Sequence, residues 1–168
     1  MMNTLMKLPL AIAVVIGLAF VAPTAQADAH SVGDGLIVKD SDFGVVKTLD
    51  RLGIALERAG ITVFSRIPHD KGAAKVGMTL APTQTIIFGN PKLGTPLMQS
   101  NPEIGLDLPL KAVAWETADG KTKIAYTDPA WLAKRYGITD KDKVFAKMTG
   151  ALNKFTDMAI KRGMLPKQ

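Results

Sequence analysis

Residues 110–126 read LKAVAWETADGKTKIAY and contain the clearest topological signal in the chain. The sequence predicts strands at 110–117 and 122–126, because Asp119-Gly120 between them favours a tight hairpin turn. A hairpin makes its two strands antiparallel neighbours. We therefore expect a sheet with antiparallel pairing at this point of the chain.

Three further strands are expected before the hairpin. Residues 61–67 and 83–88 are rich in β-branched and aromatic side chains, and residues 35–39 form a shorter apolar run. A helix between the strands at 35–39 and 61–67 is predicted from apolar residues at spacings of three and four, with Ser41 as its N-cap and Gly60 at its end. Its apolar face consists of Val45, Leu49, Leu52, Leu56 and Ala59.

Two helices are expected after the hairpin. Asp128 followed by Pro129 is a typical helix start, and Gly137 ends this short helix. The last helix is predicted to begin near Thr139 or Asp140. Its apolar stripe consists of Val144, Met148, Ala151, Phe155, Met158 and Ala159. Together the elements indicate an α+β fold, with an antiparallel sheet of about five strands and helices packed on one face.

The first 27 residues have the pattern of a signal peptide. Lys7 precedes an apolar run at 10–22, which Pro23 ends, and small residues follow. This run is shorter than the ~20 residues that a helix needs to cross a bilayer. We therefore expect residues 1–27 to be removed and the mature protein to have no stable membrane anchor.

Cleavage is expected after Ala27, with Ala29 as a second acceptable position. The mature chain would then contain a polar arm at 28–34 and a single α+β domain at 35–168. A chain processed in this way is expected in the periplasm or secreted. The cleavage site remains open between these two positions.

Composition excludes several classes of chemistry. The chain has no cysteine, which removes disulfides, thiolate nucleophiles and cysteine-bound zinc. It has 21 Lys and Arg against 15 Asp and Glu, a net charge of +6, and most of the excess follows residue 134. Such a surplus is typical of a solvated helix surface. Nucleic acid is not an expected partner for a protein outside the cytoplasm.

The connection between the strands at 83–88 and 110–117 is unusually long and apolar. We expect the loop at 90–107 to be ordered, either around a binding site or as a compact crossover. Its apolar anchors are Leu93, Leu97, Met98, Ile104, Leu106 and Leu108.

Several separated motifs occur in one order along the chain. They are residues 88–98, Leu106-Asp107-Leu108-Pro109, Ile67-Pro68-His69-Asp70 with Ala73 and Ala74, and Tyr126 with Asp128-Pro129. In these motifs the sequence resembles the family called domain of unknown function 302. The resemblance implies a strand, a helix, four antiparallel strands and a helix, with dimers among its members. It implies no activity and no catalytic residues.

Six residues are candidates for binding a small polar or anionic ligand, and we favour a binding module over other functions. They are His69, Asn90, Lys92, Thr95, Met98 and Asp107. We expect His69 and Asp107 to line one cavity with Asn90. Four of the six also have a structural explanation: Asn90 and Thr95 can satisfy backbone groups of turns, Lys92 can be solvated, and Met98 can fill the core.

Three alternatives to this reading remain open. One is a homodimeric scaffold without a ligand. Another is a hydrolase-like enzyme in which His69 and Asp107 transfer protons. The third is a Cu(I) site of His69 with Met78 or Met98, whose thioethers suit soft metals.

The expected new amino terminus generates the first testable prediction. If the mature chain begins at Asp28, its amine, the amides of Ala29 and His30 and the His30 imidazole can surround Cu(II) or Ni(II) in a square plane. After mass spectrometry of the terminus, we expect Cu(II) titration to produce a visible d–d band that His30→Ala abolishes. A terminus other than Asp28, or unchanged binding in that variant, would contradict this metal site.

Overall fold

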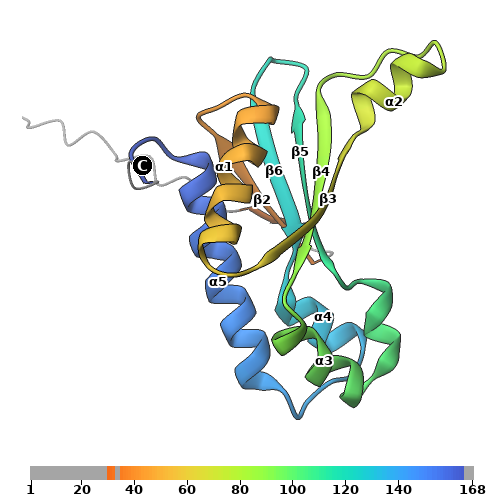
Figure 1. Cartoon of the computed structure of the whole chain (residues 1–168), viewed down its shortest axis with the longest axis vertical. Coiled ribbons are helices and arrows are strands. Elements are labelled where there is room, and N and C mark those ends of the chain that lie inside the picture. The colour runs from red at the N-terminus through yellow and green to blue at the C-terminus, as the bar shows by residue number, and fades with distance from the viewer. Residues whose placement is uncertain (1–29, 33–34, 165–168) are drawn as a thin grey trace, which may run out of the picture.

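The computed structural model describes residues 30–32 and 35–164, which form a six-stranded antiparallel sheet with helices (Figure 1). The sheet order is β1-β2-β6-β5-β4-β3. The strands are β1 (His30–Val32), β2 (Leu36–Ser41), β3 (Thr62–Pro68), β4 (Thr83–Gly89), β5 (Leu110–Glu116) and β6 (Thr122–Thr127). The predicted α+β class is confirmed, and β1 adds a short strand within the predicted polar arm.

The predicted hairpin lies at the centre of the sheet. β5 and β6 pair antiparallel, with Ala112 opposite Tyr126 and Glu116 opposite Thr122. One face of the pair is buried, since Ala114 and Ile124 are fully inaccessible to solvent. The rest of the sheet is built outward from this pair, because β4 and β3 follow on one side and β2 and β1 on the other.

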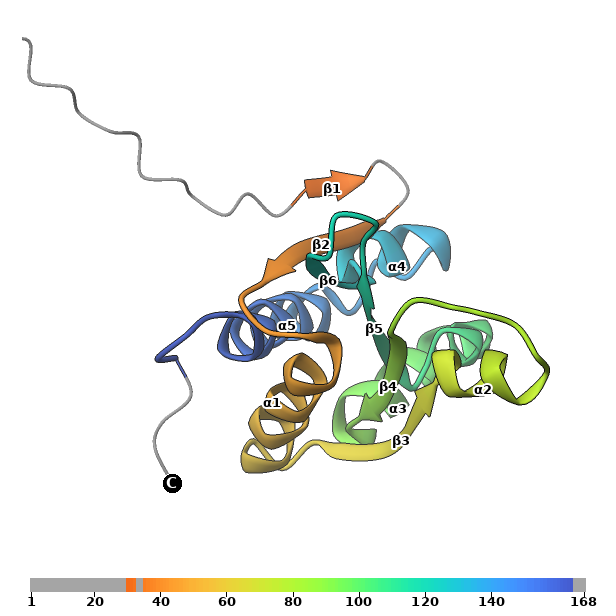
Figure 2. The same ribbon diagram turned by 90° about the horizontal axis from the view of Figure 1, so that it is seen from above.

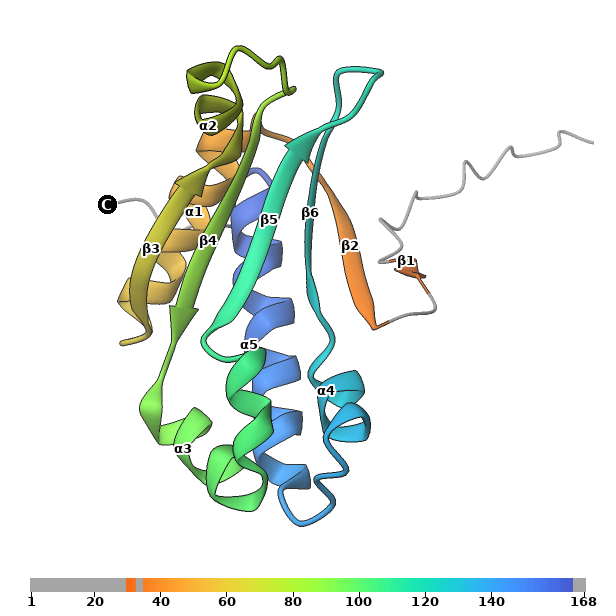
Figure 3. The ribbon, with the colours of Figure 1, turned by 90° about the vertical axis from the view of Figure 1, so that its right-hand side faces the viewer.

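Two long helices, α1 (Val45–Arg58) and α5 (Asp142–Ile160), cover the same face of the sheet (Figures 2 and 3). In the described part of the chain, no helix lies across the middle of the opposite face, which Figure 3 turns toward the viewer. The main core lies between the sheet and these two helices. Its members include Leu49, Leu52, Leu56, Ile86, Phe88, Leu152 and Phe155.

The shorter helices lie at the two ends of the sheet. At one end α3 (Pro91–Ser100), the 3-10 helix η1 (Pro102–Leu106) and α4 (Pro129–Arg135) surround the amino-terminal half of α5 (Figure 3). They form a second apolar cluster of Leu97, Ile104, Leu132, Tyr136, Ile138, Phe145 and Met148. At the other end α2 (His69–Lys75) projects beyond the strands (Figure 1).

Several local predictions were wrong in detail. The expected loop at 90–107 contains α3 and η1, and the helix α2 was not expected. Ser41 does not cap α1, whose N-cap is Gly44, because Ser41 still belongs to β2. Its hydroxyl lies 2.7 Å from Thr48 Oγ1 and accepts a hydrogen bond from the Phe43 amide.

A buried lysine joins the sheet to α5. Lys39 lies on the inner face of β2, is only 8% exposed, and donates to Thr156 Oγ1 at 2.9 Å and Asp157 Oδ1 at 3.0 Å. Tyr126 on β6 donates from its hydroxyl to Asn153 Oδ1 at 2.8 Å. Burial raises the pKa of Tyr126 to about 12, so the phenol keeps its proton at ordinary pH.

The carboxyl end of α5 is fixed by a second cation. Arg51 on α1 donates from Nε to the Ala159 carbonyl at 2.8 Å, and its guanidinium also reaches the carbonyls of Met158 and Lys161 at 2.7 Å each. A cation at this position satisfies carbonyls that the helix leaves without partners and opposes the negative end of its dipole. α5 is therefore tied to both β2 and α1.

Replacing Lys39 tests the importance of this connection. We expect Lys39→Met to lower the free energy of unfolding by about 2 kcal/mol, because it leaves polar groups of α5 without their buried donor. Lys123→Met is the matched control: its ion pair with Asp40 is exposed, and we expect a loss below about 1 kcal/mol. Urea denaturation measures both, and equal losses would contradict the role of Lys39.

Candidate functional site

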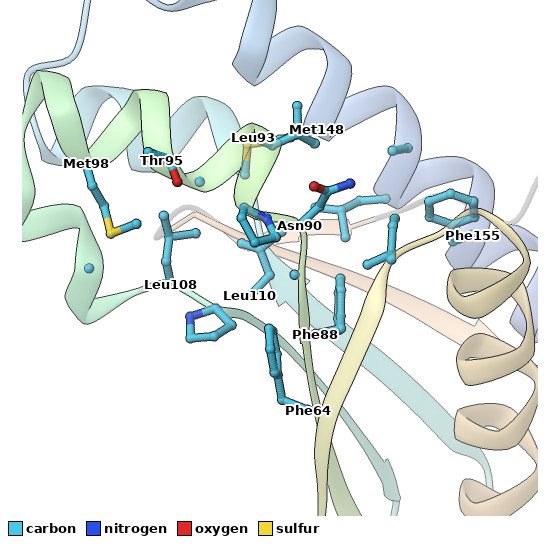
Figure 4. A pocket seen from close by; sticks show the side chains of 18 residues that line it. Phe64, Phe88, Asn90, Leu93, Thr95, Met98, Leu108, Leu110, Met148 and Phe155 are labelled. Carbon is cyan, nitrogen blue, oxygen red and sulfur yellow. The ribbon is translucent and has the colours of Figure 1, made fainter.

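A cavity of about 290 Å³ lies where α3 and η1 meet the sheet and α5 (Figure 4). We call it the α3–α5 cavity. Its side chains come from five parts of the chain: β3, β4, α3, the segment from η1 into β5, and α5. The residues that define it best are Phe64, Phe88, Leu93, Leu108, Met148 and Phe155.

The cavity has a buried inner wall and a partly open rim. Phe88, Met148 and Leu152 line it and are almost fully buried. Phe64 and Met98 also line it, but they are 53% and 39% exposed. The cavity is therefore partly open where Phe64 and Met98 line it.

Local sequence explains how α3 is placed beside the cavity. Asn90 is the N-cap of α3, and its side-chain oxygen accepts a hydrogen bond from the Lys92 amide at 2.9 Å. Pro91 follows at the first helical position, where its missing N–H costs no hydrogen bond. Gly94 lies beside Leu108, since a Cβ on this glycine would be in ordinary van der Waals contact with Leu108 Cδ1 at 3.6 Å.

The lining of the α3–α5 cavity is mostly apolar. Among the described residues no charged side chain and no histidine lines the α3–α5 cavity. Its polar side chains are Asn90 and Thr95. An apolar lining with few polar groups is typical of small-molecule sites, in which the polar groups set the orientation of the ligand.

Three of the six predicted ligand residues line this cavity: Asn90, Thr95 and Met98. Lys92 is exposed on the first turn of α3 and is not part of the lining. The structural explanation considered for Asn90 is confirmed, because its oxygen caps a helix.

His69 lies far from these residues. It begins α2, directly after Pro68, which pairs with Gln84 near the start of β4, whereas Asn90 follows the end of β4. His69 Nε2 lies 2.9 Å from Thr85 Oγ1 on the exposed surface. The expectation that His69 shares a cavity with Asn90 is therefore wrong.

Asp107 has a structural partner of its own. It accepts a hydrogen bond from the Tyr136 hydroxyl at 2.5 Å, and Arg135 Nε lies 3.7 Å from the same carboxylate oxygen. The hydrogen bond to Asp107 raises the pKa of Tyr136. Asp107 thus joins the end of η1 to α4 outside the cavity lining, and the strands separate it from His69.

The residues of the predicted metal sites do not come together in the described part of the chain. In the described part of the chain, no group of three or more His, Asp or Glu side chains is arranged to hold a metal ion. Met98 is on α3 and Met78 follows α2, so only Met78 is near the end of the sheet that carries His69. Asp28, Ala29 and the His30 side chain lie outside the described residues.

Most of the lining was missed by sequence reasoning. Phe64, Phe88 and Leu110 were assigned to strands, and Met148, Ala151 and Phe155 to the apolar stripe of the last helix. These assignments are correct, but they do not show that the same side chains also border an open space. The available signal was the long apolar connection, which supplies one whole side of the cavity.

Comparison with known proteins identifies the family. The model of the family described as domain of unknown function DUF302 matches residues 37–155, which include the sheet core, α3 and most of α5. The chain belongs to the DUF302 family. A crystal structure of an uncharacterised conserved DUF302 protein from Bacillus stearothermophilus has the same fold, with a TM-score of 0.67 and 21% identity over 74% of this chain and 98% of that one.

Curated relatives of this DUF302 domain are longer proteins. Fluoride-specific ion channel FluC 1 of Brucella suis and FluC 2 of Brucella melitensis are each 42% identical to it over 124 residues. The match covers 73% of this chain but 49% and 46% of those proteins. The chain therefore spans about half the length of the curated relatives it matches. Among its described residues, no helix has the length and apolar character needed to cross a membrane.

Mutation can distinguish the structural roles of Asn90 and Thr95, the two polar lining residues of the DUF302 domain. We expect Asn90→Ala to lower the free energy of unfolding by about 1 kcal/mol, because it removes the cap of α3. Thr95→Ala should change it by less than about 0.5 kcal/mol, because the exposed Thr95 hydroxyl makes no hydrogen bond in the described structure. Urea denaturation measures both, and equal costs would contradict this assignment of roles.

Proposed function

We propose that this DUF302 domain is a binding module whose α3–α5 cavity takes a small molecule with a hydrocarbon part. The observation that carries the proposal is the lining, in which apolar side chains from five segments surround about 290 Å³. Burial of a ligand there is driven by removal of its apolar surface from water. This differs from a site for a wholly polar ligand, which would leave most of the lining without a partner.

The cavity is supported by rigid elements. Its inner wall includes Phe88, Leu152 and Phe155, which also belong to the main core beneath α1 and α5. Side chains packed in this way keep their positions when the cavity is empty. Binding then costs little ordering of the protein, which favours affinity.

Filling the cavity tests the proposal. Ala151 lines it on α5 and is half-buried, so we expect Ala151→Phe to occupy the space and abolish binding of decanol. Ala146 is exposed on the same helix outside the lining, and Ala146→Phe should bind decanol as the unchanged protein does. Isothermal titration calorimetry measures both. The proposal fails if the unchanged protein does not bind decanol, or if Ala151→Phe binds it equally well.

A further inference from the structure

The size of the α3–α5 cavity sets the length of the hydrocarbon it can hold. An apolar cavity of about 150 Å³ holds one benzene molecule. The cavity here has about 290 Å³, roughly twice that volume, and therefore has room for roughly twelve carbon atoms. A chain of about ten carbons fits this space and leaves its head group toward the partly open rim.

Most of the charged residues that flank lining residues in the sequence are basic. The charged residues adjacent in sequence to lining residues are Lys92, Lys111, Lys147, Lys154 and Asp107. Asp107 is engaged by Tyr136 and lies near Arg135. In the described part of the chain, the ammonium groups of these four lysines have no ion pair or hydrogen bond. Their positive field is therefore not neutralised locally.

Three of these lysines belong to helices that line the cavity. Lys92 is on α3, and Lys147 and Lys154 are on α5, and both helices contribute side chains to the lining of the cavity. At 0.01 M ionic strength the Debye length is about 30 Å, so charges on these two helices act on a ligand in the cavity.

Asn90 adds a hydrogen-bond donor within the apolar lining. Its side-chain oxygen is occupied by the Lys92 amide, so its nitrogen is the group left for a ligand. The amides of Leu93 and Gly94 are already bonded to the Asn90 carbonyl. The first turn of α3 therefore offers a side-chain donor but no free backbone donor, and this donor suits an acceptor oxygen.

From these observations we infer that the ligand is an amphipathic anion, with a hydrocarbon chain of about ten carbons in the cavity and a carboxylate-like head near Asn90 and the lysines. This inference rests on the proposed function and adds the class of ligand. A cationic head would meet like charges, and an uncharged head would interact with Asn90 alone.

Three ligands with the same chain and different heads test the inference by isothermal titration calorimetry: decanoate, decanol and decyltrimethylammonium. At low ionic strength we expect decanoate to bind about threefold to tenfold more tightly than decanol, because three positive charges on the lining helices attract an anion through water by an energy of this order. This preference should decrease as salt is added, and decyltrimethylammonium should bind most weakly.

Two triple variants test whether the preference for decanoate comes from the lysines on the lining helices. Lys92→Gln, Lys147→Gln and Lys154→Gln together should remove the preference for decanoate and leave decanol binding unchanged. Lys71→Gln, Lys75→Gln and Lys161→Gln remove the same charge outside the cavity walls and should keep the preference.

Each outcome separates this inference from the proposed function. Decanol bound as tightly as decanoate by the unchanged protein would overturn the anionic head and leave the apolar cavity supported. Equal loss of preference in both triple variants would overturn the role of the local lysines. Failure of all three ligands to bind would overturn the proposed function together with the inference.

Discussion

The length of α5 is the constraint on which the rest of the structure depends. Its 19 residues span about 28 Å, whereas a seven-residue strand such as β4 spans about 23 Å. Lys39 and Arg51 hold the carboxyl-terminal half of α5 against β2 and α1. The amino-terminal half therefore extends past the sheet (Figure 3) and needs another cover for its apolar stripe.

That cover consists of α3, η1 and α4, and it produces the site. These short helices bury Phe145 and Met148 but meet the sheet only at its end. The space left between α3, the strand ends and α5 is the α3–α5 cavity. The position of the candidate site thus follows from the way in which the fold covers a long helix.

The sequence was informative wherever a single segment contains the signal. Asp119-Gly120 predicted the central hairpin, and apolar spacing predicted α1 and α5. The helix α3 was missed because Gly94 and Pro96 disfavour helix by propensity, although Asn90 and Pro91 stabilise its start. The cavity was missed because it depends on contacts between distant segments. For the same reason His69 was grouped with Asn90, although β4 separates them.

Some side chains belong both to the main core and to the cavity lining, and this limits which substitutions the domain can accept. Phe88, Leu152 and Phe155 are at once part of the main core and the inner wall of the cavity. A substitution there that reshapes the cavity also removes or overfills packing beneath α1, at a cost of about 1 to 5 kcal/mol. Variation in selectivity among relatives is therefore expected at the rim, where Phe64, Thr95 and Met98 are exposed and can change with little loss of stability.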